Sequence, residues 1–462
     1  MCGIVGIVMK DHARANSTRA GDLAVRALQR LQHRGHEGAG LVVADDETGM
    51  FRKRHGVGLV SKVLRAKKRK QLVGSSAVAA NRYSTAGEKD DPNPKRNLGP
   101  LVADAWFGPV VLAHNGNNKG ATVLRNKLKA EGALFQTGTD TEIMLHFLAR
   151  SRGETFQERL LEALGKIPIA YSFVIMTAEG LWAVRDPLGV RPLLLGSHAD
   201  FYTVASETTA LQVNGVECWR EVDPGEVVFV PHDGEIQSFR FAHKIPPQPC
   251  IFEYHYFARP DSANVESARR EAGKVLARNH PVVARAGAEV VVVGVPDSGL
   301  LAANGYAREA GLPLELALVR AHGWRTFMRP TQEERRMALE LKHSPIRDLL
   351  VGKIVILVDD SIVRGNTFQR IVGFVRSAGA REVHGRIATS KIVHPCFYGI
   401  DTPTFEELLA HRYPGEEVMA TELGLDSLAF LTLPEFIEVT QRATGKQTFC
   451  TTCFSGELLS TC

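Results

Sequence analysis

The sequence has few cysteines and no long hydrophobic run. Its 462 residues include 7 cysteines at irregular spacing, which is not the framework of a small disulfide-stapled secreted protein. No stretch approaches the ~18 consecutive apolar residues that a membrane helix needs. The first residues lack a basic region followed by an apolar run, so we expect no signal peptide. These absences predict a cytoplasmic protein with reduced thiols and no membrane partner.

The sequence also lacks a strong excess of charge of either sign. Its 56 basic and 51 acidic residues give a net charge of +5. The densest basic run, KVLRAKKRK at residues 62–70, contains no aromatic side chain to stack on nucleic-acid bases. Such a run is usually a solvated face, and we therefore expect no nucleic-acid partner.

The composition is otherwise that of a globular protein with more than one domain. Hydrophobic residues make up 44% of the chain, and its length predicts two to three domains of ~150 residues each. Residues 1–240 alternate short β-like runs with glycine-rich turns, which predicts a layered α/β domain with antiparallel sheets. Prolines cluster at residues 246–249 and indicate a linker. Residues 241–462 alternate continuous apolar runs with helical stretches, which predicts a parallel sheet flanked by helices.

The segment KIVILVDDSIVRGNT, at residues 353–367, carries the most information about chemistry. An apolar strand ends in the carboxylates Asp359 and Asp360, and the following loop leads into a segment with the apolar spacing of a helix. A helix N-terminus binds anions through its backbone N–H groups, and a carboxylate pair suits ribose hydroxyls or a divalent cation. Acidic residues are common at strand ends in doubly wound folds. The prediction of a ligand site therefore depends on the apolar strand, the acid pair and the loop following one another in this order. The loop residues are Ser361, Ile362, Val363, Arg364, Gly365, Asn366 and Thr367.

The N-terminus, MCGIVGI, is a second informative segment. Cys2 is either an ordinary buried residue that serves only packing or, once Met1 is removed, an N-terminal nucleophile. In the second case its own α-amino group can serve as the base, because the pKa of such a group is ~8. The heptapeptide alone leaves both interpretations open.

Together these motifs resemble those of one enzyme family. In the form VDDSIVRG, residues 358–365 are similar to the phosphoribosyl-pyrophosphate fingerprint of the glutamine-dependent amidophosphoribosyltransferases. The segments QHRGHEGAG, NRYSTAG, HNGN and GTDTE follow in the order found in the family's N-terminal-nucleophile glutaminase domain. The resemblance covers nearly the whole chain. It implies a glutaminase domain at residues 1–240 and a type I phosphoribosyltransferase domain at residues 241–462.

For the glutaminase, the resemblance implies that Cys2 attacks the glutamine amide. The Asn115 side chain and the Gly116 N–H are then the donors that stabilise the tetrahedral oxyanion. Arg82 would bind the α-carboxylate of glutamine, and Asp140 its α-ammonium group. Taken singly, Arg82 and Asp140 are more typical of structural ion pairs, and Asn-Gly is more typical of a hairpin turn. The motifs together with a cysteine at position 2 favour the catalytic interpretation.

For the second domain, the resemblance implies a magnesium ion bound by Ser298, Asp359 and Asp360, and phosphate groups bound by residues 361–367. Ammonia would displace pyrophosphate at C1 of phosphoribosyl pyrophosphate and give phosphoribosylamine, the first step of purine biosynthesis. The family also implies a homotetramer. Two alternatives stay open: a divergent paralogue that aminates another phosphorylated sugar, and a non-catalytic regulator that binds phosphoribosyl groups.

Four cysteines match the ligands of a cluster in one branch of this family: Cys250, Cys396, Cys450 and Cys453. The last two form CTTC, and a lone C-x-x-C is a redox pair, half a zinc site or neither. Four thiolates complete a four-iron four-sulfur site or a structural zinc site, and the resemblance favours iron. Cys218 is expected to be buried filler.

The chain departs from the family pattern in the predicted substrate loop. The run RAHGW, Arg320–Trp324, is one residue shorter than the family's run, and Glu340 stands where a basic residue is usual. A carboxylate that faces a polyanionic substrate repels it. These changes leave the glutaminase motifs intact but put the acceptor, or the closure of the loop, in question.

Overall fold

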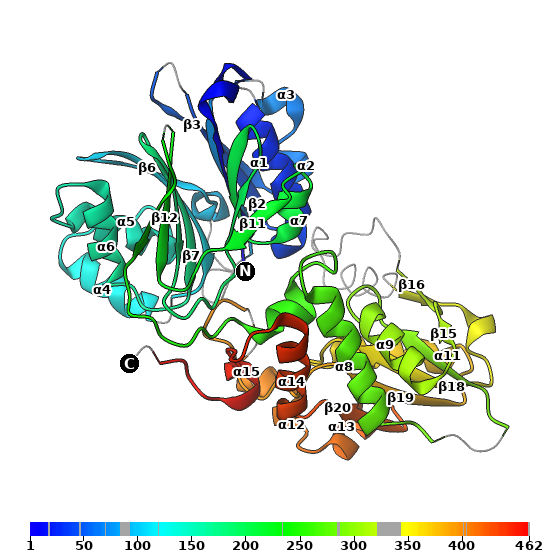
Figure 1. The fold of residues 1–462 in the computed structure, drawn as a ribbon. Helices are drawn as coiled ribbons and strands as arrows, with labels where there is room; N and C mark the ends of the chain where they lie inside the picture. Colours follow the sequence, from blue (N-terminus) through cyan, green and yellow to red (C-terminus); the bar gives the residue numbers. More distant parts are fainter. Residues whose placement is uncertain are drawn as a thin grey trace. The chain divides into compact units, whose positions relative to one another are not determined.

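The chain forms two compact units in a computed structural model (Figure 1). Unit 1 contains Met1–Cys250, Cys396–Asp401 and Ser460–Cys462, and unit 2 contains Ile251–Pro395 and Thr402–Leu459. The model describes residues 1–16, 19–45, 48–69, 71–83, 93–118, 120–232, 234–283, 287–320, 343–400, 402 and 404–460. In this described part, no helix is both long and apolar enough to cross a membrane.

Residues 241–250 belong to unit 1, although the sequence-based boundary places them in the second domain. Backbone hydrogen bonds explain the difference, because the N–H groups of Gln248 and Cys250 donate to the carbonyl oxygens of Leu188 and Val190. The predicted substrate-loop residues from 321 to 324, and Glu340, lie outside the described residues.

The first sheet of unit 1 is antiparallel and has the N-terminal strand at its centre. Strand β1 (Ile4–Met9) pairs on one edge with β4 (Ser76–Arg82) and on the other with β10 (Phe201–Ala205). The order of its seven strands is β11-β9-β10-β1-β4-β2-β3. All six residues of β1 are buried, as the run IVGIVM predicts. The other strands are β2 (Gly38–Ala44), β3 (Phe51–Val57), β9 (Leu194–Ser197) and β11 (Cys218–Glu221).

The second sheet of unit 1 is also antiparallel, with six strands in the order β13-β12-β8-β7-β6-β5. Strand β6 (Gly108–Gly116) carries the HNGN motif at its end and pairs with β7 (Tyr171–Thr177). The other strands are β5 (Leu101–Ala105), β8 (Gly180–Arg185), β12 (Glu226–Pro231) and β13 (Gln237–Arg240).

The two sheets pack face to face between helices, which makes unit 1 a four-layered structure (Figure 1). Alternate residues of β1, such as Ile4 and Val8, join Val174 and Met176 of β7 in the core between the sheets. The outer face of the first sheet is covered by α1 (Arg19–Arg30). Helices α5 (Thr141–Arg150) and α6 (Phe156–Leu164) cover the outer face of the second. Further helices are α2 (Val60–Val63), α3 (Ala66–Arg69), α4 (Ala121–Ala130) and α7 (Thr208–Gln212).

Unit 2 is built on a parallel sheet in the order β15-β14-β18-β19-β20. On one face, Val291, Val355 and Val383 pack with residues of α11 and α13. Alternation places Gly294 on the other face, where it lies against Ala303 of α9. The strands are β14 (Val290–Gly294), β15 (Leu314–Glu315), β18 (Ile354–Asp359), β19 (Glu382–Ile387) and β20 (Ser427–Phe430). The helices include α8 (Val265–Asn279), α9 (Leu300–Ala310), α11 (Asn366–Ser377), α12 (Leu409–Arg412), α13 (Glu416–Leu423), α14 (Leu433–Thr444) and α15 (Thr452–Ser455).

These sheets confirm the predicted fold class, with antiparallel sheets in the first half and a flanked parallel sheet in the second. A short antiparallel pair, β16 (Leu318–Arg320) with β17 (His343–Pro345), accompanies the parallel sheet of unit 2.

Helices α8 and α9 contact each other through their backbones, and glycine makes this approach possible. A Cβ at Gly273 would overlap the Ala302 carbonyl oxygen, and a Cβ at Gly305 would overlap the Arg270 carbonyl oxygen. By contrast, Gly373 lies on the exposed face of α11 with no neighbouring atom within 4 Å of where a Cβ would stand.

We predict opposite effects for two Gly→Ala substitutions in unit 2. Gly273→Ala should lower the free energy of unfolding by about 1–3 kcal/mol, because the added methyl group forces α8 and α9 apart. Gly373→Ala should raise it by about 0.5–1 kcal/mol, because alanine is the better helix former at an open position. Urea unfolding of the two variants measures both effects, and a Gly273→Ala variant as stable as the unsubstituted chain would disprove the close backbone packing.

Candidate active sites

Cys2 lies two residues before β1, and the packing of the two sheets brings it to the end of β6. Its backbone N–H donates to Asn115 Oδ1 at 3.2 Å, and its Sγ is 3.9 Å from the Tyr83 carbonyl oxygen. The next N–H, that of Gly3, donates to Asn81 Oδ1 at 2.7 Å. Two asparagine side chains therefore fix the first residues of the strand, and the Cys2 side chain remains partly exposed.

The end of β6 provides the two predicted oxyanion donors. The Asn115 side chain is fully buried, and its Nδ2 has no hydrogen-bond partner in the described part of the chain. An unsatisfied buried amide costs about 1–3 kcal/mol, so its presence beside Cys2 points to a ligand that accepts from it. Gly116 has no room for a side chain, because a Cβ there would overlap the Ala170 carbonyl oxygen.

Asp140 immediately precedes α5, and its carboxylate contacts residues in and after the end of β6. Its Oδ2 accepts from the Asn118 N–H at 2.9 Å, and its Oδ1 lies 3.5 Å from His114 Nδ1. His114 Nδ1 is also 3.1 Å from Thr141 Oγ1. Burial alone would raise the pKa of Asp140, but His114 and the N–H groups of Asn118 and Thr141 hold it below its usual value. The carboxylate is therefore kept ionised, as binding of an ammonium group requires.

Arg82 ends β4, one residue after the Asn81 that holds Gly3. Its Nη1 donates to the Asn97 carbonyl oxygen at 2.6 Å, and its Nε lies 3.8 Å from Glu37 Oε2. Arg82 and Gly3 lie at the same end of the neighbouring strands β4 and β1, and the Asn97 carbonyl oxygen holds the Arg82 guanidinium.

The acid pair of unit 2 lies at the carboxyl end of β18, and both carboxyl groups are buried. The Asp360 N–H donates to Asp359 Oδ1 at 2.9 Å, and Ser361 Oγ donates to Asp360 Oδ2 at 2.6 Å. Burial, followed by the charge of Asp360, raises the pKa of Asp359 well above its usual range. Two buried carboxyl groups side by side are a donor set that fits Mg²⁺, which binds oxygen ligands and would relieve their repulsion.

The turn that contains Ser298, a predicted magnesium ligand, lies against this acid pair. Ser298 is in the turn before α9, and the Val295 N–H donates to the Val358 carbonyl oxygen at 2.9 Å. A Cβ at Gly299 would lie 2.6 Å from that same oxygen and 2.9 Å from the Asp359 Cα. The structure therefore brings Ser298 and the acid pair to one edge of the sheet.

The loop after the acid pair leads into α11, which begins at Asn366. Gly365 is the N-cap in a left-handed conformation, φ 88°, and Asn366 and Thr367 are exposed in the first turn. A helix N-terminus presents free N–H groups that can bind an anion, and the phosphate site predicted at residues 361–367 stays a prediction. The Arg364 side chain binds Glu407, because its Nε donates to Glu407 Oε2 at 2.8 Å.

The chain matches two domain families and curated relatives over almost its full length. Residues 93–213 match a glutamine amidotransferase domain, and residues 276–390 match a phosphoribosyl transferase domain. Amidophosphoribosyltransferase 1, chloroplastic, from Arabidopsis thaliana is 43% identical, over 99% of this chain and 78% of that protein. The amidophosphoribosyltransferase of Bacillus subtilis is 40% identical, over 99% of this chain and 93% of that protein.

A solved structure agrees with these matches. The glutamine phosphoribosylpyrophosphate amidotransferase from B. subtilis, complexed with ADP and GMP, is 39% identical. It superposes with a TM-score of 0.88 and covers 99% of this chain and 97% of that one. The chain belongs to the amidophosphoribosyltransferase family. This confirms the family that the sequence motifs predicted.

The four cysteines predicted to bind a cluster in this amidophosphoribosyltransferase are divided equally between the units. In unit 1 the Cys250 N–H donates to Val190, and Cys396 Sγ accepts from the Tyr398 N–H at 3.3 Å. In unit 2 Cys450 and Cys453 are buried. Within the described ranges, no group of three or more His, Cys, Asp or Glu side chains is arranged to hold a metal ion. The four-cysteine site thus stays a prediction.

Cys218 is exposed on β11, not buried as expected, because β11 is an edge strand whose side chains are largely in solvent.

The sequence motifs assigned no role to Asn81, Asn118 or His114, although each lies in or beside a recognised motif. Their roles depend on partners far along the chain, which a local motif does not identify.

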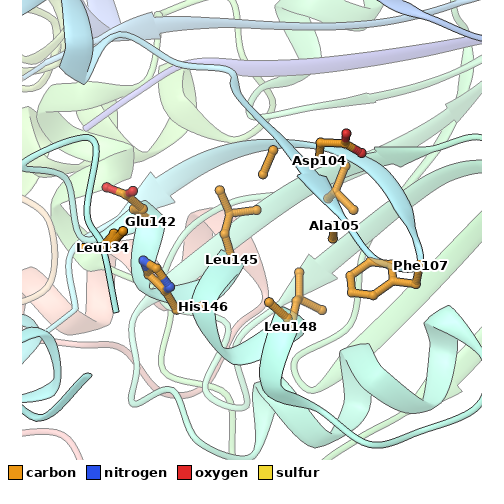
Figure 2. A pocket seen from close by; sticks show the side chains of 11 residues that line it. Asp104, Ala105, Phe107, Leu134, Glu142, Leu145, His146 and Leu148 are labelled. Carbon is orange, nitrogen blue, oxygen red and sulfur yellow. The ribbon is translucent and has the colours of Figure 1, made fainter. Parts of the chain in front are cut away.

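A separate cavity of about 240 Å³ lies between β5 and α5 of unit 1 (Figure 2). Glu142 and His146 of α5 line it together with apolar residues such as Leu145 and Phe107. The Glu142 carboxylate already accepts from the N–H groups of residues 136 and 137. None of the predicted site residues lines this cavity, and we assign it no function.

The contact between His114 and Asp140 predicts that substitution of His114 makes glutamine binding dependent on pH. In a His114→Gln variant the pKa of Asp140 should rise, because burial is no longer opposed by the imidazole. Below the raised pKa, the KM for glutamine should increase about tenfold per pH unit, while the unsubstituted enzyme holds its KM. Steady-state glutaminase assays between pH 5 and 8 measure this.

The matched control is His146→Gln, which removes a histidine from α5 that faces the cavity of Figure 2. It should leave the pH dependence of KM unchanged. Identical KM profiles for both variants would show that His114 does not set the ionisation of Asp140.

Proposed function

We infer that this protein is an amidophosphoribosyltransferase. It hydrolyses glutamine at one site and uses the ammonia at a second site to displace pyrophosphate from C1 of phosphoribosyl pyrophosphate. The observation that carries this is the presence of both sites in one chain. Cys2 lies against the unsatisfied Asn115 amide in unit 1, and the buried acid pair precedes the N-terminus of α11 in unit 2. The two alternatives, a paralogue with another acceptor and a non-catalytic regulator, find no support among the relatives.

In the glutaminase site, we propose that removal of Met1 makes Cys2 the N-terminal residue. The Cys2 thiol gives its proton to the α-amino group, and its sulfur forms a bond to the amide carbon of glutamine. The Asn115 Nδ2–H and Gly116 N–H donate to the oxyanion, and Asn115 Oδ1 keeps the Cys2 nitrogen in place. Collapse of the intermediate breaks the C–N bond and releases ammonia with the transferred proton. Water then hydrolyses the thioester to glutamate.

Two charged side chains fit the ends of the glutamine substrate. Asp140, which its neighbours keep ionised, binds the α-ammonium group. Arg82 binds the α-carboxylate, and its contact with Asn97 fixes the guanidinium for that role. Holding the substrate by both groups places its amide for attack.

In the transferase site, Ser298, Asp359 and Asp360 would hold Mg²⁺, which neutralises charge on the leaving pyrophosphate. The acid pair also accepts hydrogen bonds from the ribose hydroxyls. Residues 361–367 and the first turn of α11 donate N–H and hydroxyl groups to the 5′-phosphate. The C1–O bond to pyrophosphate breaks, a C1–N bond to ammonia forms, and the nitrogen loses a proton.

We further propose that Cys250, Cys396, Cys450 and Cys453 bind a four-iron four-sulfur cluster. Four thiolates are a complete ligand set for such a cluster. We also propose a homotetramer in the cytoplasm, by the resemblance of the chain to its family.

Substitution of the nucleophile should separate the two reactions. We expect Cys2→Ser to lower glutamine-dependent synthesis of phosphoribosylamine by about a thousandfold or more, because the thiol is the group that cleaves the amide. Synthesis from ammonium salts should stay close to that of the unsubstituted enzyme. Pyrophosphate release measured with each nitrogen source decides this, and equal loss of both activities would contradict the division of labour.

Asp359→Asn is the reciprocal variant. It should remove pyrophosphate release with either nitrogen source, because the acid pair serves only the second site. Glutamate formation from glutamine alone should remain at its basal level. Unchanged affinity for phosphoribosyl pyrophosphate by calorimetry would mean that the acid pair has been wrongly assigned.

The cysteine proposal predicts about four irons per chain and a brown colour after anaerobic purification. Cys450→Ser should lower the iron content and the visible absorbance, whereas Cys218→Ser, a cysteine exposed on β11, should change neither. Metal analysis that finds one zinc per chain and no visible absorbance would replace the cluster with a structural zinc site.

A further inference from the structure

A segment from late in the chain packs on the HNGN motif of unit 1. Residues 396–401 belong to unit 1, although unit 2 precedes and follows them in sequence. Asn117 Nδ2 donates to the Phe397 carbonyl oxygen at 3.0 Å. The Nε of Arg191, a fully buried side chain, donates to the Tyr398 carbonyl oxygen at 2.7 Å. Two successive carbonyl groups of this segment are thus held by side chains of the glutaminase unit.

The next residue of this segment, Gly399, lies against Gly116 itself. Gly399 has φ 115°, and a Cβ on it would lie 3.3 Å from the Gly116 carbonyl carbon and 3.2 Å from Arg191 Nε. On its other side, Gly116 is confined by the Ala170 carbonyl oxygen and the Tyr171 Cα. Gly116 therefore lies between the start of β7 and Gly399.

This confinement matters because the Gly116 N–H makes no hydrogen bond in the β6–β7 ladder, although Gly116 pairs with Tyr171. Asn117 and Ala170 exchange both backbone hydrogen bonds, at 3.1 and 3.4 Å. The preceding pair, Gly116 with Tyr171, is then a non-hydrogen-bonded pair, so the Gly116 N–H points away from β7. A glycine in this position has wide conformational freedom unless its neighbours restrict it.

The segment is itself well anchored. The Tyr398 side chain is buried, and its N–H donates to Cys396 Sγ at 3.3 Å, which closes a tight turn. The backbone of Arg191 is fixed as well, because its carbonyl oxygen accepts from Arg185 Nε at 3.0 Å and from Ser172 Oγ at 3.1 Å.

We propose that residues 397–399 are a positioning element for the oxyanion hole. Packing of Gly399 on Gly116, with the Asn117 and Arg191 hydrogen bonds, fixes the direction of the Gly116 N–H. This rests on the proposed function, because it assumes that the Gly116 N–H stabilises the oxyanion at Cys2. A donor of this kind must be aimed before the reaction, and loss of one costs about 10²–10³ in rate.

The test is Gly399→Ala, which places a methyl group against Gly116. The matched control is Gly108→Ala in the β5–β6 turn, where φ is 111° but no atom lies within 4 Å of the added Cβ. We expect Gly399→Ala to lower glutamine-dependent kcat about tenfold to a hundredfold relative to Gly108→Ala. The KM for glutamine should change little, since Arg82 and Asp140 bind its other end.

Two measurements distinguish a misdirected donor from general damage. The rate at which iodoacetamide alkylates Cys2, and the ammonia-dependent synthesis, should both equal those of Gly108→Ala, because neither needs the oxyanion hole. Should Gly399→Ala fail to fold, Asn117→Ala removes the hydrogen bond to Phe397 and should lower kcat in the same selective manner.

Equal kcat values for Gly399→Ala and Gly108→Ala would overturn the proposal. So would parallel losses of kcat, alkylation rate and ammonia-dependent synthesis, which indicate damage to the whole unit. Failure of the proposed function has a different signature: the unsubstituted enzyme would lack glutaminase activity, or Cys2→Ser would retain it.

Discussion

The pairing of β1 on both of its edges is the constraint on which the glutaminase site depends. Strands β4 and β10 hold all of β1 in the centre of a sheet, and its six residues are buried. Cys2 precedes this strand by a single glycine, so its position follows from the sheet and needs few contacts of its own. The Asn115 contact then joins it to the second sheet across the core between them. The backbone of Cys2 and Gly3 is thereby held by hydrogen bonds to two asparagine side chains.

Both proposed sites contain buried polar groups in an environment that is unfavourable without a ligand. In unit 1 the group is the Asn115 amide, which is buried without an acceptor in the described structure. In unit 2 it is the pair Asp359 and Asp360, where burial and then the charge of Asp360 raise the pKa of Asp359. Each arrangement costs stability in the absence of its ligand. A fold tolerates such groups where a ligand compensates them, an oxyanion in the first case and a cation with ribose hydroxyls in the second.

Sequence patterns correctly predicted the features that depend on residues close together in the chain. The apolar run before Asp359 is β18, the loop after it leads into α11, and the two sheet types occur in the expected halves. The long-range features did not follow from local patterns. Residues 396–401 join unit 1 through hydrogen bonds to Asn117 and Arg191, and His114 approaches Asp140 because β6 ends beside α5. Such contacts depend on how distant elements pack, which neither periodicity nor a single motif specifies.

We propose that one chain couples glutamine hydrolysis to amination of phosphoribosyl pyrophosphate. The most direct measurement supplies glutamine labelled with ¹⁵N in its amide, together with phosphoribosyl pyrophosphate and Mg²⁺. Glutamate, pyrophosphate and ¹⁵N-phosphoribosylamine are then quantified in the same reaction. We expect equal amounts of all three, with the label in the aminated product. Glutamate formed without pyrophosphate, or an aminated product only from a different sugar phosphate, would contradict it.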